Sequence, residues 1–461
     1  MKKIAMNKKR WIILIASLIV LSAVIILIIV VAIGNMFICH TGKPQSQFEG
    51  SVKQEWISSY RYGVNFWTSA QDIAVDQQGN IYVTSMGDCS NTTKFNSAGE
   101  QLWVANSSRM DIAAIAVDAQ GGVYVTGLRS DNASSTELAI VKYDADGNEL
   151  WITRLSNSND SYYEQYISAA LDKHGNVYVA IGSSTTRYTI KCNGSDGTEL
   201  WIASHESLCR NLGAPYVVVD VLENVYVSGA DEIVKYDSGG REIWTISTVE
   251  EGENCGGGCL LAIDPLENVC MASYIQRDYV FEDGTKDWQG GYRVAKYDGN
   301  GSKIWAVAHY GVPCEGCARS GSTMDLGFPR DIAVDEQGNV YIAGEFKTVK
   351  YSADGVLLWT GISGNALAID SIGNTYVTGT DGKWCVTTKY NIDGTKVWAA
   401  RYWGGLEDFW GWGSIPDGIA LDVSDNVYIT GTSIYKICPV LFSDRTEDDY
   451  IEYITTRYSQ Q

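Results

Sequence analysis

Residues 331–359 read DIAVDEQGNVYIAGEFKTVKYSADGVLLW and form the shortest complete copy of a unit that recurs along most of the chain. Short runs rich in Val, Ile and Tyr, bounded by turn residues, are typical of β-strands. Strand A is the apolar run that ends before Asp335, and strands B, C and D follow at 339–343, 349–351 and 357–359. The unit therefore predicts four short strands joined by tight turns.

Three residue types mark the copies. Asp335 can accept hydrogen bonds from turn amides and Gly338 tolerates positive φ, so the turn between strands A and B is specified chemically. The Asp that ends strand A recurs at Asp76, Asp118, Asp172, Asp220, Asp264, Asp335, Asp370 and Asp422. The basic residue near the end of strand C recurs at Lys94, Lys142, Lys191, Lys235, Lys296, Lys350, Lys389 and Arg457. The strand-D tryptophan recurs at Trp56, Trp103, Trp151, Trp201, Trp244, Trp305, Trp359 and Trp398.

A four-stranded repeat spaced by about 40–50 residues is the signature of a β-propeller blade. One blade cannot bury both faces of its sheet, so neighbouring blades must pack on each side, with the tryptophans between them. Trp56 precedes every strand A, whereas the last copy begins with a strand A at 418–421 and contains no strand D. We expect the segment around Trp56 to supply that strand. The fold class is then all-β: an eight-bladed propeller closed by an N-terminal outer strand, with no exposed sheet edge.

The repeated pattern DxxGNVYVTG followed by KYDxDGxxLW, with a Gly-Gly and an acidic residue between copies as in 402–408, resembles the SBBP β-propeller repeat family over residues 53–461. The resemblance implies a propeller and an extracytoplasmic location, but little chemistry. Copies two to four also resemble the tryptophan-docking repeats of quinoprotein propellers, for example at 196–201. Quinoprotein dehydrogenases carry an adjacent Cys-Cys pair near the cofactor. This chain has no such dipeptide, which argues against that enzyme class.

The N-terminal region has the pattern of a membrane signal anchor. Residues 1–10 contain five basic residues and no acid, and 11–33 are apolar and uncharged. Such a run is long enough to cross a bilayer, and the basic cluster is expected to stay in the cytoplasm. We therefore expect a cytoplasmic tail and transmembrane helix at 1–34, a linker at 35–52 and the propeller at 53–461, outside the cytoplasm at the cell membrane. A long cleaved signal is the alternative, whereas a lipoprotein site at Cys39 lacks the small residues that such a site needs.

The body of the chain is acidic. The whole chain has 35 basic and 55 acidic residues, and without the five basic residues of the first ten it has 30 against 55. A negative body is a poor ligand for nucleic acid or for an anionic membrane surface. Charge therefore excludes nucleic-acid binding as the expected function, although acidity also serves solubility.

Connection lengths favour one face of the ring as the functional face. The A–B and C–D turns are short and uniform, whereas the B–C and D–A connections on the opposite face vary widely. Binding residues tend to lie on variable loops carried by a rigid scaffold. Aromatic and acidic residues of this variable face that could form a platform for a sugar or a peptide are Phe66, Trp67, Trp403, Asp408, Trp410 and Trp412. The alternative is a local mini-core that pins long loops.

Four cysteines lie in two D–A connections that should be neighbours in the ring. They are Cys255, Cys259, Cys314 and Cys317. An exported protein favours disulfides, and these four are disulfide candidates; four thiolates could alternatively bind zinc. No metal site is assigned. Cys192 and Cys270 fall within strands and are expected to be buried thiols.

No catalytic grouping is readable around the four histidines, and the cofactor, if any, is undetermined. The leading hypothesis is a membrane-anchored propeller that binds or scaffolds a protein, peptide or glycan through its variable face. The alternatives are an extracytoplasmic enzyme, quinoprotein-like or a metal-dependent lyase or hydrolase, and a structural envelope component. Because a strand D around Trp56 would start at the C–D turns, the sequence also predicts that the anchor joins the propeller at its short-turn face.

Overall fold

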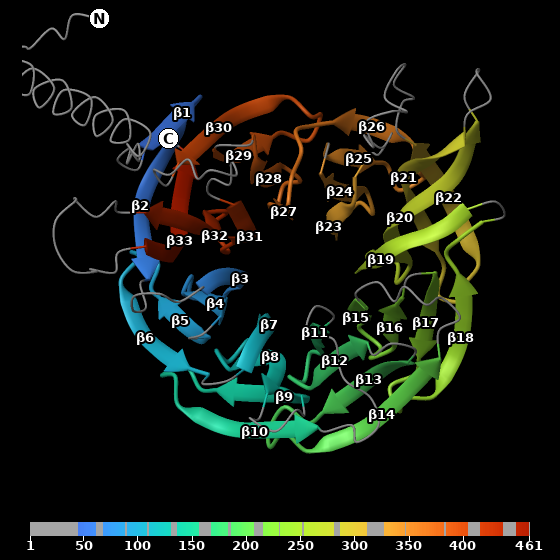
Figure 1. Cartoon of the computed structure of the whole chain (residues 1–461), viewed down its shortest axis with the longest axis horizontal. Helices are drawn as coiled ribbons and strands as arrows, with labels where there is room; N and C mark the ends of the chain where they lie inside the picture. Colours follow the sequence, from blue (N-terminus) through green and yellow to red (C-terminus); the bar gives the residue numbers. More distant parts are fainter. Residues whose placement is uncertain are drawn as a thin grey trace, which may run out of the picture.

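The computed structural model describes most of the chain, namely residues 45–60, 68–87, 90–107, 110–130, 136–155, 167–182, 186–206, 215–229, 231–250, 253–280, 286–310, 327–345, 347–381, 384–403, 415–436 and 449–460. Eight antiparallel sheets are arranged around a central axis (Figure 1). In six of them the four strands follow the chain from the centre to the rim, and blades seven and eight each add an N-terminal strand at the rim. The expected eight-bladed β-propeller is therefore confirmed.

The strands of the first four blades follow the chain. Blade one consists of β3 (Thr68–Val75), β4 (Ile81–Gly87), β5 (Asn91–Phe95) and β6 (Gln101–Asn106). Blade two consists of β7 (Met110–Val117), β8 (Val123–Ser130), β9 (Thr136–Tyr143) and β10 (Glu149–Leu155). Blade three consists of β11 (Ile167–Leu171), β12 (Val177–Gly182), β13 (Thr186–Cys192) and β14 (Glu199–Glu206). Blade four consists of β15 (Val217–Val219), β16 (Val225–Ser228), β17 (Glu232–Tyr236) and β18 (Glu242–Ser247).

The next three blades continue the same order. Blade five consists of β19 (Glu253–Ile263), β20 (Val269–Val280), β21 (Lys286–Tyr297) and β22 (Lys303–Tyr310). Blade six consists of β23 (Pro329–Val334), β24 (Val340–Gly344), β25 (Val349–Tyr351) and β26 (Leu357–Thr360). Blade seven contains β27 (Ala366–Ile369), β28 (Thr375–Thr380), β29 (Cys385–Tyr390) and β30 (Lys396–Trp403).

Blade eight closes the ring with strands from both ends of the chain. It consists of β31 (Ile415–Leu421), β32 (Val427–Lys436), β33 (Asp449–Gln460) and β2 (Val52–Tyr60). β2 pairs antiparallel with β33, and Trp56 lies opposite Arg457. The predicted closure by the segment around Trp56 is confirmed, and the outer strand it supplies satisfies the edge of β33.

One segment of the expected linker is a strand instead. Gln45–Glu49 forms β1, a fifth strand that pairs antiparallel with the rim strand β30 of blade seven. Part of the segment predicted as a linker at 35–52 therefore belongs to the propeller. The eight-residue β30 would otherwise present unpaired backbone groups at the rim, and β1 satisfies them. Glu49 also forms a salt bridge with Lys396, with 2.7 Å between Oε1 and Nζ.

The A–B turns use the expected chemistry. In blade six, Asp335 Oδ1 accepts from the backbone N–H groups of Gln337 and Asn339, and its Oδ2 accepts from the Asn339 amide and the Tyr341 hydroxyl. Gly338 takes φ +78°. In blades four, five and eight the same left-handed position is held by non-glycine residues, namely Glu223, Glu267 and Asp425. The hydrogen bonds to the turn aspartate therefore stabilise a backbone conformation that costs an L-residue about 1–2 kcal/mol.

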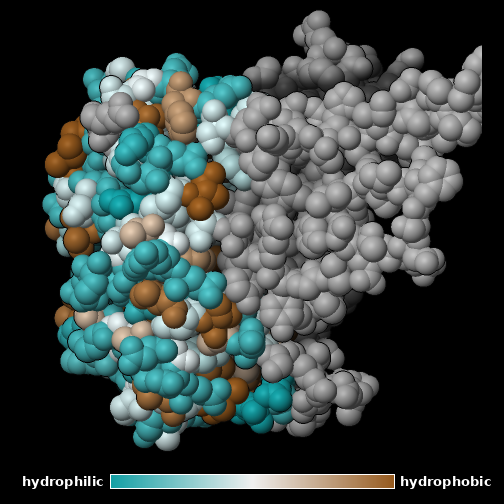
Figure 2. All heavy atoms as spheres, turned by 90° about the vertical axis from the view of Figure 1, so that its left-hand side faces the viewer, coloured by the Kyte–Doolittle hydropathy of each residue, from teal (hydrophilic) through white to brown (hydrophobic). Residues whose placement is uncertain are grey.

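The hydrophobic core lies between blades. The Tyr82 side chain of blade one packs with Ile112, Ile115 and Val123 of blade two, and Trp103 covers the outer end of this cluster. Equivalent clusters fill the other junctions. On the described outer side of blades eight and one, hydrophobic residues lie in small separate patches among hydrophilic ones (Figure 2). The packing energy is thus concentrated at the junctions.

The expected cytoplasmic tail and transmembrane helix at 1–34 lie outside the described residues. Within the ranges given above, no helix is long and apolar enough to cross a bilayer.

Removing the closing strand should destabilise the ring. A chain that begins at Tyr62 lacks β1 and β2 and exposes the whole edge of β33, so we expect aggregation or a melting temperature lower by at least about 10 °C, because the lost strand also carries one junction's tryptophan. Differential scanning calorimetry is the measurement. A matched chain that begins at Gln45 retains both strands and should melt like the full chain; equal melting of the two truncated chains would contradict this closure.

Candidate functional site

The predicted ligand platform lies almost wholly outside the described residues. This holds for Phe66, Trp67, Asp408, Trp410 and Trp412. Trp403 is the last residue of β30, and its backbone pairs with Gln45. The platform on the variable face therefore stays a prediction.

The disulfide prediction is wrong for Cys259, which is a free, fully buried thiol. The register of β19 places it opposite Ser273, and its side chain packs with Tyr226 and Ile233 of blade four. This burial raises the pKa of the thiol and keeps it uncharged. Cys255 lies on β19 opposite Ile275, while Cys314 and Cys317 lie outside the described residues. Cys192 and Cys270 are buried free thiols, as predicted.

Seven blade junctions share one polar contact. The indole N–H of the rim-strand tryptophan donates to a backbone carbonyl in the C–D turn of the next blade, at 2.8–3.3 Å. The donor and acceptor pairs are Trp56 and Ser97, Trp103 and Ala145, Trp151 and Gly194, Trp201 and Ser238, Trp244 and Gly299, Trp305 and Ala353, and Trp359 and Ile392. In all seven the acceptor is two residues after the aromatic or cysteine residue that ends strand C.

The junction between blades seven and eight differs because of the way the ring closes. Strands C and D of blade eight come from opposite ends of the chain, so no C–D turn joins them. Gln460 occupies the acceptor position two residues after Tyr458, but it continues β33 and pairs with Val52 instead of turning. Gly50, with φ +82°, lies against the Cα and Cβ of Trp398, where a turn glycine approaches the indole in the other junctions.

Trp398 is consequently the one strand-D tryptophan whose indole N–H has no hydrogen-bond partner among the described residues. Its side chain is 1% exposed, because it packs in the cluster between blades seven and eight with Tyr376, Val427 and Tyr458. The N–H has no protein acceptor among the described residues, and Trp398 lines the wall of a pocket. Leaving a buried donor unsatisfied costs about 1–3 kcal/mol. The Trp398 N–H therefore gains free energy when a hydrogen-bond acceptor reaches it.

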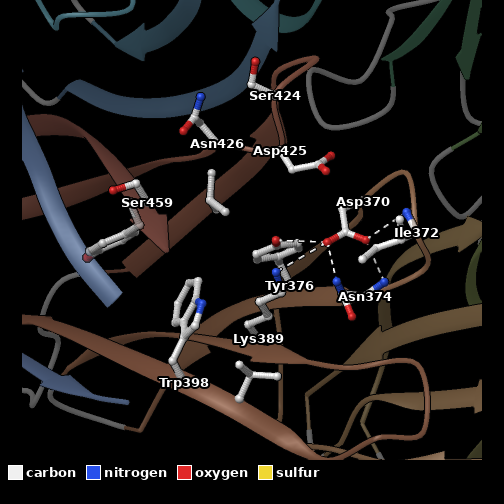
Figure 3. Close-up of a pocket in the computed structure, with 13 residues that line it drawn as sticks. Asp370, Ile372, Asn374, Tyr376, Lys389, Trp398, Ser424, Asp425, Asn426 and Ser459 are labelled. Atoms are coloured by element: carbon white, nitrogen blue, oxygen red, sulfur yellow. Dashed lines mark hydrogen bonds and ion pairs between the residues drawn. The ribbon is translucent and has the colours of Figure 1, made fainter. Parts of the chain in front are cut away.

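A pocket of about 450 Å³ lies at this junction, here called the seam pocket. Its volume is within the range of about 300–1,000 Å³ that is usual for ligand sites. The A–B turns of blades seven and eight and neighbouring strands of both blades line it together, with the residues Asp370, Ile372, Asn374, Tyr376, Lys389, Val397, Trp398, Ser424, Asp425, Asn426, Val427, Tyr458 and Ser459. Figure 3 shows the indole nitrogen of Trp398 on the side of the ring that faces Tyr376 and Lys389.

The charged groups in the wall are held by the fold. Asp370 accepts from the backbone of Ile372 and Asn374 and from the Tyr376 hydroxyl, and Lys389 lies 3.5 Å from its Oδ2. Asp425 accepts from the backbone and hydroxyl of Ser371. The wall can therefore bind and orient a polar group. Among the side chains that the structure describes, no group of three or more His, Cys, Asp or Glu is placed to hold a metal ion.

A second polar feature, which the sequence analysis missed, lies on the inner strands. The carboxylates of Asp72 and Asp331 accept backbone N–H groups of the next blade, from Ile115 at 3.0 Å and from Leu367 at 2.8 Å. Each aspartate lies four residues before the turn aspartate of its blade, which is the only sequence signal. Burial raises the pKa of Asp72 to about 6 and that of Asp331 to about 7. Each carboxylate therefore links its own blade to the next one through a hydrogen bond.

The fold and the closing seam define this chain as an eight-bladed β-propeller. Among solved structures, the C-terminal WD40 domain of Sif2 is similar over 88% of this chain and 98% of that chain, with a TM-score of 0.52 and 11% identity. The Dos1 propeller is similar over 88% of this chain and 95% of that chain, with a TM-score of 0.51 and 12% identity. No protein-family model and no curated protein matches the sequence. The similarity is one of fold.

Stability should fall as pH rises through the titration of Asp331. Its pKa in the folded chain is raised by burial, and the charge of Asp72 raises it further, so the protonated form is favoured in the folded state. The stabilisation is fully present below the ordinary pKa of 3.8 and is lost as pH rises through about 7. Asp331→Asn mimics the protonated acid and should melt a few degrees above the native chain at pH 8 but alongside it at pH 5.

The control for this measurement is Asp354→Asn, a change in an exposed C–D turn. Thermal melts of the three chains at pH 5, 6, 7 and 8 give the comparison. A constant difference between Asp331→Asn and the native chain across this range would show that Asp331 does not titrate there.

Proposed function

We propose that this chain is a membrane-anchored, extracytoplasmic propeller that binds a polypeptide partner, and that the partner docks on the short-turn face over the seam pocket. The apolar run at 11–33 and the resemblance to SBBP repeats support the anchor and the location. The propeller fold supports a scaffold role. The observation that carries the proposal is the buried, unpaired Trp398 N–H in the wall of a pocket.

The rim of the seam pocket favours a polypeptide. Ile372 is 67% exposed, and Val423, next to Ser424 of the pocket wall, is 77% exposed. Ile392 in the C–D turn of blade seven is 55% exposed and lies within van der Waals reach of the Gly373 position. Exposed aliphatic side chains around a pocket with polar groups are typical of protein-interaction sites. A glycan platform would require exposed aromatic faces, and Trp398 is buried.

The position of β1 changes the expected orientation on the membrane. β1 runs from Gln45, opposite Trp403 at the variable face, to Glu49, opposite Ala399 toward the short-turn face. The expectation that the preceding chain reaches the propeller at the short-turn face is therefore wrong: it arrives at the variable face. In the proposed arrangement the variable face is the membrane-proximal one, and the seam pocket points away from the bilayer.

Photo-crosslinking in cells tests the docking surface. A photoreactive amino acid at Ile372 should give a discrete polypeptide adduct, because this exposed side chain stands at the pocket rim. The matched control is the same amino acid at Gln120, an exposed A–B turn position of blade two on the same face. Mass spectrometry identifies the adduct. Adducts of equal yield from both positions, or none from position 372, would contradict a polypeptide site at the seam.

Surface labelling tests the orientation. An azide-bearing amino acid at Gln337, in an A–B turn, should react faster with a bulky impermeant reagent on spheroplasts than one at Asp381, in a B–C connection, because the variable face lies toward the membrane. Reaction rates on the detergent-solubilised chain normalise the intrinsic exposure of both sites. A rate ratio that is the same on spheroplasts and in detergent would show that the tether leaves both faces equally accessible.

A further inference from the structure

Seven junctions of the ring share one contact, between a C–D turn and the tryptophan of the preceding blade. At each of them a tight turn places one backbone carbonyl on the indole N–H of the preceding blade. In four of them a strand-C lysine donates to the same carbonyl; these are Lys94 to Ala145, Lys142 to Gly194, Lys235 to Gly299 and Lys350 to Ile392. The chain thus repeatedly recognises a β-turn by its carbonyl.

The seam pocket contains the side chains that correspond to those contacting the turn at the other junctions. Trp398 and Lys389 are the counterparts of the tryptophan and lysine, and both line the pocket, as does Tyr376, the counterpart of the strand-B tyrosine (Figure 3). The Lys389 ammonium lies over the Tyr376 ring at 4.8 Å, as Lys350 lies over Tyr341 in the preceding blade. The receiving side chains therefore have the arrangement that binds a turn elsewhere in the ring.

We propose, resting on the polypeptide-binding function above, that the seam pocket binds a tight β-turn of the partner, with one backbone carbonyl of that turn accepting the Trp398 Nε1–H. The partner turn takes the place that a C–D turn holds at the other junctions. Because Gly50 already covers the Cα and Cβ of Trp398, the incoming turn approaches from the N–H edge of the indole. Ser424, Asn426 and Ser459 line the space around it.

Charge favours a neutral carbonyl over an anion. The wall carries two carboxylates, Asp370 and Asp425, against one ammonium, Lys389. A free carboxylate or a phosphate would meet a net negative wall, whereas a peptide carbonyl carries no net charge and forms the same hydrogen bond.

The C–D turns that occupy the other junctions indicate which turn sequences fit there, and the Asp-x-x-Gly type is one of them. In blade two, Gly147 N–H donates to Asp144 O, and Asp144 Oδ1 accepts from Asp146 and Asn148.

The probe is a hairpin peptide that copies residues 142–150, closed by a terminal disulfide, so that it presents the Ala145 carbonyl that Trp103 binds in blade two. It is added to the full-length chain carrying ¹⁵N at the indole nitrogens, and binding is followed in the ¹⁵N–¹H spectrum. We expect the Trp398 indole resonance, assigned by its loss in Trp398→Phe, to move downfield as the N–H gains an acceptor. Fluorescence anisotropy of the labelled peptide gives the dissociation constant.

Two matched changes isolate the hydrogen bond. Trp398→Phe removes the N–H and should weaken peptide binding about tenfold, the ratio for one hydrogen bond, whereas Trp305→Phe, whose N–H already binds Ala353, should leave binding within about twofold. A peptide in which the carbonyl of the Ala145 position is reduced to a methylene should bind the native chain about tenfold more weakly. This last comparison does not depend on how well the Trp398 variant folds.

Three results would overturn the inference: no binding of the hairpin, binding that leaves the Trp398 resonance unmoved, or equal binding of the hairpin and its reduced analogue. Preferential binding of a linear peptide carboxylate with movement of the same resonance would also overturn it in favour of an anionic ligand. If the crosslinked adduct at position 372 forms while the hairpin does not bind, the proposed function stands and the turn-recognition inference fails.

Discussion

The carboxylate that ends each inner strand holds a blade junction together. In blade five, Asp264 accepts from the backbone and side chain of Asn268 and forms a buried salt bridge of 3.0 Å with Lys296. Burial alone would raise the pKa of this carboxyl, but the Asn268 hydrogen bonds and the Lys296 ammonium together hold it below its ordinary value. Lys296 in turn donates to the Gly338 carbonyl of blade six. One ionised group thereby fixes a turn, orients a lysine and reaches the neighbouring blade, and the repeat is built around it.

This dependence explains why so much of the fold could be predicted. The turn aspartate, the strand-C lysine and the rim tryptophan all contact the strand-B tyrosine, as Asp335, Lys350 and Trp359 contact Tyr341 in blade six, so each leaves a fixed residue at a fixed place in the repeat. Counting them gave the number of blades, and the position of Trp56 before the first strand A gave the closure that β2 and β33 confirm. β1 could not be predicted in the same way, because QSQFE repeats nothing and its pairing depends on the exposed edge of β30. Cys259 was assigned wrongly because strand register, which buries it, is not visible in cysteine spacing.

The seam pocket was missed for a related reason. Repeats reveal what is present in every copy, whereas this pocket arises where one copy lacks an element. The sequence does contain the signal: strand D carries eight tryptophans, but the C–D turns provide only seven glycines, at Gly99, Gly147, Gly197, Gly240, Gly301, Gly355 and Gly394. The eighth tryptophan, Trp398, therefore had no turn to receive it. The residues of the predicted aromatic platform follow no repeat, and nothing in their pattern fixes how they lie relative to one another.

Closing a ring with strands from both chain ends makes one junction chemically unlike the others. At seven junctions the chain satisfies its own indole N–H groups with backbone carbonyls of the next blade. At the eighth, closure removes the turn, and the indole N–H has no protein acceptor among the described residues. An unsatisfied buried donor generally costs about 1–3 kcal/mol. In the proposed complex, a partner that supplies the carbonyl satisfies this donor on binding. The strand that closes the ring thereby leaves one junction with an unused donor, which is the basis of the proposed site.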